Sequence, residues 1–232
     1  TLSLADQVIV PECIPEEWYL RYVQKKHLIR FKGIDEVGWL SNFSPEKSVL
    51  EPLGLEEEDY IVCRTEPTKA QYLADKMEPH ETQLTEIIPE LIRTTDLTYV
   101  IITRYREQYE YLRSHFEKEI ENNEVRIYEA LDNLAQIMYF SKAVISGGGT
   151  MVRESALLGV PSIEYFPLGT YPQEQFLIEH GFPLTHLKKS SEIISEVLKY
   201  IKSDFKVDTT EKIKQLDNPI QIAYREFKKR IT

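Results

Sequence analysis

The chain has 232 residues, of which 42% are hydrophobic and 28% are charged, as in an ordinary globular protein. Its 38 acidic and 28 basic residues give a formal net charge of −10. This balance excludes nucleic acid as a general partner, because a protein that binds the phosphate backbone uses many Lys and Arg side chains to neutralise it.

The two cysteines and five histidines give no sign of a disulfide framework or a metal site. Cys13 and Cys63 stand in different apolar runs without C-x-x-C spacing, which is typical of a protein from a reducing compartment. The histidines are scattered without metal-ligand spacing. No apolar run reaches the roughly 18 residues of a membrane-spanning helix. We therefore expect a cytoplasmic protein with no membrane span, no metal and no other cofactor.

The first part of the chain, residues 1–54, has little regular patterning. It contains predicted strands at residues 7–10 and 27–32, a predicted helix at residues 15–23, and a turn-rich segment through Pro45. The chain begins without Met, close to a predicted buried strand. We interpret residues 1–54 as the remnant of a preceding N-terminal domain plus a connector, and the chain as a fragment that lacks most of that domain.

In residues 55–190, short apolar runs alternate with helical patterns. The predicted strands lie at residues 60–64, 98–103, 125–128, 143–146 and 161–165, with a sixth near 184–187. The predicted helices between them lie at residues 82–93, 106–119, 132–142, 151–158 and 173–180. The strand runs are almost continuously apolar, as expected for parallel strands that are covered on both faces. Repeated strand–helix–strand units predict a doubly wound parallel sheet, which is a Rossmann-like α/β fold.

The ends of two of these helices carry recognisable signals. Asp132 is the predicted N-cap of the helix at 132–142. Gly159, followed by Pro161, ends the helix at 151–158. These signals support the division of the chain into alternating elements.

The last segment, residues 191–232, contains two predicted amphipathic helices, at residues 192–202 and 210–230. The second helix carries an apolar stripe of Ile213, Leu216, Ile220, Ala223, Tyr224 and Phe227. We expect this helix to pack away from the sheet and to return towards the N-terminal domain.

The most informative motif is the turn from Ser146 to Thr150, which follows the fourth predicted strand of the sheet. Its three central residues are Gly147, Gly148 and Gly149. Without Cβ atoms, their N–H groups can close on an anion at the start of the next helix. Thr150 can donate its hydroxyl to a phosphate, and Glu154 can reach the ribose hydroxyls beyond it. Alternatively, the turn needs small residues only in order to pack.

Two other phosphate-binding motifs fit this turn less well. A P-loop requires lysine after its last glycine, and here Thr150 follows instead. The dinucleotide fingerprint G-x-G-x-x-G has Val152 at its third glycine position, and that fingerprint normally follows the first strand of a sheet. A dinucleotide site stays open as an alternative because Glu164, on the next strand, stands where an acid could bind a ribose.

Residues 146–163, SGGGTMVRESALLGVPSI, resemble the nucleotide-binding core of the GT-B glycosyltransferase and UDP-N-acetylglucosamine 2-epimerase superfamily. They are similar to the C-terminal domain of the peptidoglycan N-acetylglucosaminyltransferases, where a small-residue turn precedes a helix with a glutamate and a closing Gly-x-Pro. Residues 31–33, 138–154 and 156–163 also resemble a largely archaeal family of uncharacterised proteins within the superfamily. The resemblance covers most of the chain and implies a preceding N-terminal domain.

The resemblance also implies roles for individual residues. The turn at residues 147–150 would face the diphosphate of a nucleotide-sugar, and Glu154 would face its ribose. Gln173 and Gln175, which follow the next strand, would contact the donor sugar, unless they only decorate the helix they begin.

Three arginines follow the first two strands of the sheet. Where the transferases have a glycine-rich loop, this chain has Arg64 and the residues that follow it. Arg64 either binds phosphate through its guanidinium group or pairs with a neighbouring acid. Arg104 and Arg106 either line the same cleft or are exposed charges at the start of a helix.

These observations favour three functions. The first is the nucleotide-sugar-binding half, most simply for a UDP-sugar, of a GT-B type glycosyltransferase-like enzyme with an unknown acceptor. The second is a UDP-sugar 2-epimerase-like enzyme, and the third is a nucleotide-sugar-binding protein without catalysis. The catalytic residues stay unknown at this level.

Overall fold

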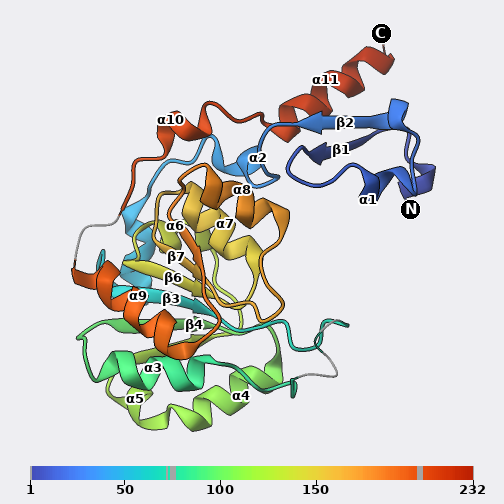
Figure 1. Cartoon of the computed structure of the whole chain (residues 1–232). Helices are drawn as coiled ribbons and strands as arrows, with labels where there is room; N and C mark the ends of the chain where they lie inside the picture. The colour runs from blue at the N-terminus through green and yellow to red at the C-terminus, as the bar shows by residue number, and fades with distance from the viewer. Residues whose placement is uncertain (1, 72, 74–76, 203–205, 232) are drawn as a thin grey trace.

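The structure is a computed structural model that describes residues 2–71, 73, 77–202 and 206–231 (Figure 1). Its centre is a six-stranded sheet in the order β5-β4-β3-β6-β7-β8, in which all neighbouring strands are parallel. The strands are β3 (Tyr60–Arg64), β4 (Thr98–Ile102), β5 (Val125–Tyr128), β6 (Ala143–Ser146), β7 (Ser162–Glu164) and β8 (Leu184–His186). The predicted Rossmann-like sheet is confirmed, with Ser146 at the carboxyl end of a central strand.

The strand order places a topological switch point between β3 and β6. If the six strands are numbered 1 to 6 along the chain, beginning with β3, their spatial order across the sheet is 3-2-1-4-5-6. The chain winds outward from β3 in one direction and then from β6 in the other. Ligands of such sheets bind in the crevice at the carboxyl ends of the two strands that meet at this point.

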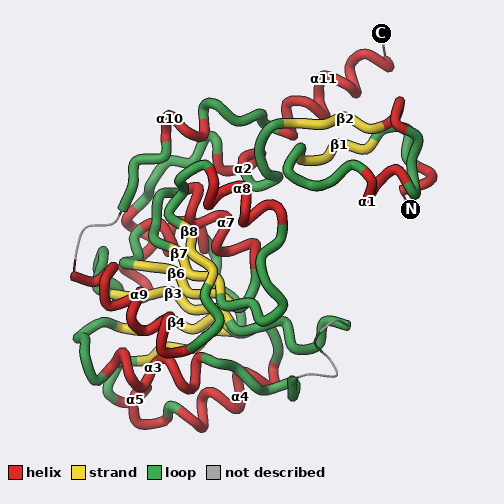
Figure 2. Tube along the Cα trace, in the orientation of Figure 1, coloured by secondary structure: helices red, strands yellow, loops and turns green. Residues whose placement is uncertain are grey.

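Helices cover both faces of the sheet (Figures 1 and 2). They are α3 (Leu84–Ile92), α4 (Arg106–His115), α5 (Glu117–Glu121), α6 (Leu134–Tyr139), α7 (Gly149–Leu157), α8 (Pro172–Glu179) and α9 (Ser190–Lys202). Successive strand side chains point to opposite faces, so Val62 joins a core with α6, α7 and α8, while Cys63 joins a core with α3 and α9. Apolar burial on both faces explains why the strands are almost continuously hydrophobic.

Some helix ends differ from the sequence-based expectations. Asn133, in the left-handed conformation with φ 56°, precedes α6, so the prediction of Asp132 as the N-cap is wrong. The helix predicted at residues 106–119 is divided at Phe116 into α4 and α5, since the backbone of Phe116 (φ −106°, ψ 29°) leaves helical geometry. Gly159 has φ +81° directly after α7, which confirms the predicted helix end.

The N-terminal segment forms a small unit beside the main sheet. It contains η1 (Leu2–Leu4), β1 (Val8–Pro11), α1 (Glu17–Leu20), η2 (Lys25–His27), β2 (Leu28–Phe31), α2 (Val37–Leu40) and η3 (Lys47–Leu53). β1 and β2 pair in parallel, and the helix predicted at residues 15–23 is reduced to α1. Ile34, Val37 and Leu50 belong to the same hydrophobic core as Val62. The connector therefore packs on the sheet, and the division at residue 54 stays a prediction.

The C-terminal segment after α9 contains two helices, α10 (Thr210–Ile213) and α11 (Pro219–Ile231). The single helix predicted at residues 210–230 is therefore wrong. Pro219 lacks an N–H group and is favoured in the first turn of a helix, so it starts a new one. α11 lies beside α2 and β2, away from the six-stranded sheet (Figure 1). Its Tyr224 and Phe227 are exposed, while the docking of α11 on an N-terminal domain stays a prediction.

Within the described residues, none of the helices is long and apolar enough to cross a membrane.

Candidate functional site

The glycine turn connects β6 to α7 at the switch point. Two of its backbone N–H groups are already used: that of Gly147 donates to Arg64 O (3.0 Å), and that of Gly148 donates to Ser146 Oγ (3.2 Å). Ser146 is fully buried and its hydroxyl donates back to Gly148 O (2.8 Å). Ser146 and Gly147 thus brace the turn, and the N–H groups of Gly149 and Thr150, in the first turn of α7, are among those that lack an intrahelical partner.

Each glycine of the turn has a different neighbour. A Cβ atom on Gly147 would lie 2.6 Å from Glu66 Cγ and 2.8 Å from Glu66 Cα, and a Cβ atom on Gly149 would collide with the Glu174 carboxylate. A Cβ atom on Gly148 would lie 2.5 Å from Arg104 Nη2. Close packing against Glu66 and Glu174 therefore explains why residues 147 and 149 are glycines. At position 148 the absence of a Cβ atom leaves room for the guanidinium group of Arg104.

Arg64 and Arg104 lie together at this edge of the sheet. Arg64 pairs in register with Ser146, and burial together with the nearby Arg104 lowers the pKa of Arg64 to about 10. Arg104 is half-buried, and its Nε donates to Thr65 O (2.9 Å). Within the described part of the chain, neither guanidinium forms an ion pair with a carboxylate. Two neighbouring cations without acids create a positive field that favours an anion.

Arg104 and Arg106, for which the sequence left the same two alternatives open, have different surroundings in the structure. Arg106 is exposed and pairs with Glu110 (2.9 Å) and Glu129 (3.5 Å), as an ordinary charge at the start of a helix does. Arg104 instead turns onto Gly148.

Buried polar groups hold the loop after β3 in place. Gln108 is fully buried, accepts hydrogen bonds from Thr65 Oγ1 (2.7 Å) and the Arg104 N–H (3.2 Å), and donates to Glu66 O (3.0 Å). Glu66 accepts from Thr82 Oγ1 (2.6 Å) and from the Gln83 N–H (2.9 Å), while burial raises its pKa. Sequence reasoning missed these residues, although a glutamine in the first turn of an otherwise charged helix was an available signal.

Glu154 lies on α7 beyond the glycine turn and is half-buried. One of its oxygens, Oε1, accepts a hydrogen bond from Trp39 Nε1 (3.0 Å), and burial raises its pKa. Trp39, on α2, is itself 52% exposed. The Glu154 carboxylate therefore stands at the edge of the protein, with one oxygen held and Oε2 directed to no described partner. Thr150 is exposed and accepts from Arg153 Nη2 (3.3 Å).

A buried ion triad joins the connector, α7 and α8. Arg153 donates through Nε to Glu36 Oε1 and through Nη1 to Glu174 Oε1, both at 2.6 Å. The two glutamates are 3% and 0% exposed. Glu174 Oε2 also accepts from the Tyr171 N–H (3.1 Å). No local pattern in the sequence indicates this triad, because its members are far apart in the chain.

Glu164 and His186 follow Ser146 in one row across the carboxyl edge of the sheet. Glu164 is fully buried, and burial together with the nearby Glu174 raises its pKa to about 8. Its Oε2 lies 3.2 Å from His186 Nδ1, and burial lowers the pKa of His186. Glu164 is enclosed and its raised pKa disfavours the charged form, so it is unsuited to the ribose-binding role of the dinucleotide alternative.

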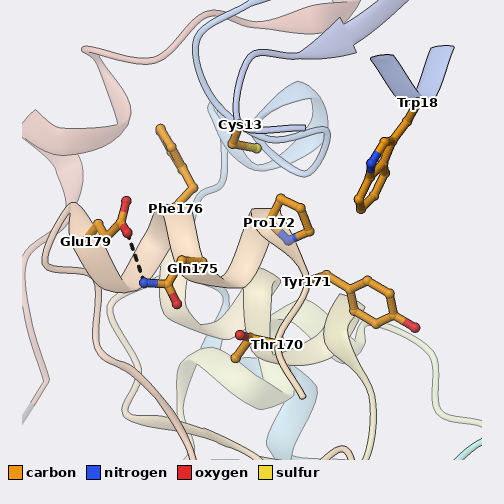
Figure 3. A pocket seen from close by; sticks show the side chains of 8 residues that line it. All are labelled: Cys13, Trp18, Thr170, Tyr171, Pro172, Gln175, Phe176 and Glu179. Atoms are coloured by element: carbon orange, nitrogen blue, oxygen red, sulfur yellow. Dashed lines mark hydrogen bonds between the residues drawn. The ribbon is translucent and has the colours of Figure 1, made fainter. Parts of the chain in front are cut away.

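The two glutamines of α8 do not come together on the glycine turn. Gln173 is half-buried in the first turn of α8. Gln175 is exposed, donates to Glu179 Oε1 (2.9 Å), and lines a separate pocket (Figure 3). Their contact with a donor sugar stays a prediction. No described group of three or more His, Cys, Asp and Glu side chains is arranged to hold a metal ion.

A family model described as "Protein of unknown function (DUF354)" matches residues 1–230. The chain belongs to the DUF354 family. This DUF354 chain is also 30% identical over 203 residues to an uncharacterised protein, MJ0665, of Methanocaldococcus jannaschii. The match covers 85% of the chain but 55% of that relative, so the chain spans about half the length of its curated relative.

Solved structures with the same fold include UDP-N-acetylglucosamine 2-epimerases. The Rickettsia bellii epimerase matches with a TM-score of 0.68 and 14% identity, over 97% of this DUF354 chain and 59% of that chain. The Methanocaldococcus jannaschii epimerase, in complex with UDP-GlcNAc and UDP, matches with a TM-score of 0.62 and 14% identity, over 93% and 57%. Anabaena HepE, in complex with UDP, matches with a TM-score of 0.62 and 16% identity, over 97% and 63%. These likenesses establish a Rossmann-like fold with structural neighbours in the GT-B superfamily.

Proposed function

We propose that this chain binds the diphosphate of a UDP-sugar at the switch point between β3 and β6, as one half of a GT-B type glycosyltransferase-like enzyme. One observation carries the proposal: Arg104 lies against Gly148 at the start of α7, with Arg64 nearby, and neither arginine has a carboxylate partner among the described residues. Both side chains are half-buried, and a partly desolvated guanidinium that lacks an acid is stabilised by an anion.

The donors at this site suit a diphosphate. The two guanidinium groups supply charge-assisted hydrogen bonds, and the N–H groups of Gly149 and Thr150 add the positive end of the α7 dipole. In glycosyl transfer the bond between the sugar C1 and the diphosphate oxygen breaks, and that oxygen keeps the electron pair. Donors already in position stabilise this developing charge.

Glu154 is placed to bind the ribose. Trp39 holds Oε1, which leaves Oε2 to accept a ribose hydroxyl. The neighbouring structures support a uridine nucleotide, since the Methanocaldococcus jannaschii epimerase and Anabaena HepE are both described in complex with UDP.

The proposal is tested by calorimetric titration of the chain with UDP. We expect Arg104→Ala to weaken UDP binding by roughly tenfold or more, because it removes a hydrogen bond between charged groups worth about 1.5–3 kcal/mol. Arg106→Ala is the matched control, because Arg106 is two positions away and already paired with Glu110 and Glu129. Equal affinity of the two variants would contradict the proposal, and titrations with ADP and GDP establish the base.

A second activity has support from the solved structures that share this fold, which include UDP-N-acetylglucosamine 2-epimerases from Methanocaldococcus jannaschii and Rickettsia bellii. Incubation of the protein with UDP-N-acetylglucosamine, followed by NMR of the nucleotide-sugar, separates the alternatives. Inversion at C2 identifies an epimerase, and release of UDP that requires an added acceptor identifies a transferase. Binding without either product identifies a nucleotide-sugar-binding protein.

A further inference from the structure

A pocket of about 600 Å³ lies between α8 and the N-terminal segment. Its lining residues are Cys13, Trp18, Thr170, Tyr171, Pro172, Gln175, Phe176 and Glu179. Figure 3 shows Trp18 and Cys13 on one side and the residues of α8 and its preceding loop on the other. The pocket is therefore built from two parts of the chain that only the fold brings together.

The pocket and the glycine turn lie on opposite sides of α8. Glu174 points towards Arg153 and Gly149. A helix turns about 100° per residue, so the pocket-lining Pro172, Phe176 and Glu179 lie roughly 140–160° around α8 from Glu174, and Gln175 about 100°. α8 therefore separates the pocket from the proposed diphosphate site.

Two large aromatic side chains form apolar walls. Trp18 is 50% exposed and Tyr171 is 40% exposed. The ring of Phe166 stacks on Tyr171, with 5.7 Å between the ring centroids, and supports it from the protein side. Half-exposed aromatic rings held in position offer a flat apolar surface with a wet rim, which is suited to the C–H face of a sugar ring.

Pro172 and Phe176 add further apolar surface, and the polar lining groups are not cationic. The amide of Gln175 donates to the Glu179 carboxylate (2.9 Å), and Thr170 adds an exposed hydroxyl. Burial raises the pKa of Cys13 to about 11, so its thiol is neutral at pH 7. None of the described lining residues is Lys or Arg, so the pocket offers nothing to neutralise a phosphate or carboxylate. Amide, hydroxyl and carboxylate groups are suitable partners for the hydroxyls of a neutral ligand.

We propose that this pocket binds a neutral pyranose ring, packed against Trp18 and Tyr171, with its hydroxyls on Gln175 and Glu179. Assigning that sugar as the acceptor rests on the proposed function. Glu174 fills the side of α8 that faces Gly149, so we place the sugar attached to a diphosphate at Gly149 outside the pocket. The pocket then takes a separate saccharide.

The two tryptophans of the chain allow each site to be tested alone, because Trp18 lines the pocket and Trp39 contacts Glu154. Trp39→Phe leaves Trp18 as the only indole, and its emission is titrated with N-acetylglucosamine and methyl β-glucoside. We expect a saturable change in the millimolar range, a weaker response to anionic glucuronate, and none to the linear polyol sorbitol.

Tyr171→Ala in the same background should weaken sugar binding about fivefold, because an aromatic contact contributes about 1 kcal/mol beyond buried area. Tyr224→Ala is the matched control, since Tyr224 is a 58% exposed tyrosine on α11 outside the pocket. Saturation-transfer NMR with the unmodified chain and the same sugars keeps the test independent of whether the variants fold.

An unchanged Trp18 emission together with no saturation transfer would overturn the proposal, as would an equal response to sorbitol. Trp18→Phe leaves Trp39, whose emission on titration with UDP tests the proposed function separately. If UDP-glucose changes Trp18 emission and competes with the free sugar, the pocket holds the donor sugar and the acceptor assignment is wrong. Simultaneous binding of UDP and free sugar supports the assignment of the pocket to the acceptor.

Discussion

Gly147 and Gly148 are neighbours of the same residue type, and the structure predicts opposite consequences when each is replaced by alanine. At Gly147 the new methyl group would lie 2.8 Å from Glu66 Cα and 2.9 Å from Glu66 N, so it meets backbone that cannot move alone. At Gly148 it would lie 2.5 Å from Arg104 Nη2, which is the far end of a flexible side chain. Gly148 has φ −165°, an extended conformation open to alanine.

The magnitudes follow from these contacts. Overpacking against fixed backbone costs about 1–3 kcal/mol, which for a chain of this size lowers the Tm by roughly 2–12 °C. Gly148→Ala instead displaces the Arg104 guanidinium at a stability cost of about 0.5 kcal/mol or less. It removes the charge-assisted hydrogen bond that Arg104 is proposed to donate to phosphate, worth about 1.5–3 kcal/mol, so UDP affinity should fall by roughly 10- to 150-fold.

The assay combines thermal denaturation with calorimetric titration of UDP for the two variants and the unmodified chain. We expect Gly148→Ala to keep its Tm and lose affinity, and Gly147→Ala to lose Tm. If Gly148→Ala binds UDP as tightly as the unmodified chain, Arg104 does not bind phosphate. If Gly147→Ala is fully stable, the contact with Glu66 does not require glycine at this position.

Two further predictions concern the buried charges near this site. Arg153→Met should lower the free energy of unfolding by about 3–5 kcal/mol, because it leaves the Glu36 and Glu174 carboxylates buried without their cation; a loss below about 1 kcal/mol in urea denaturation would contradict this. The pKa of Glu164 is raised from 4.5 to about 8, so the folded chain holds a proton that the unfolded chain releases, and stability should fall as pH rises through that window. The side chain of Glu164→Gln stays neutral, so the stability of this variant relative to the unmodified chain should rise between pH 6.5 and 8, a range above the titration of His186. The expected rise is up to about 1.4 kcal/mol per pH unit, and parallel pH profiles of the two proteins would refute this.

The sequence by itself determined the strands of the main sheet and their alternation with helices. Near-continuous apolar runs such as residues 60–64 and 143–146 can be buried only between two helical layers, so their alternation with helices specifies a parallel sheet. The glycine turn was also readable, because three glycines between a strand and a helix form a local pattern. Gly159 ended its helix as expected, since a left-handed residue after a helix is set by neighbours in the chain.

Only the tertiary structure decided which side chains meet. Arg104 and Arg106 have the same local context, yet one reaches Gly148 and the other pairs with Glu110 and Glu129. The reason is that strand order, with β3 beside β6, brings the loops after β3 and β4 onto the turn after β6, and local periodicity does not carry strand order. Trp39 meets Glu154 across 115 positions of the chain. Gln175 turns away from the glycine turn because Glu174, its neighbour, takes the buried face of α8 to pair with Arg153. Contacts of this kind depend on distances across the fold. The sequence pattern therefore identifies candidate site residues, and the packing of the chain determines which of them lie together.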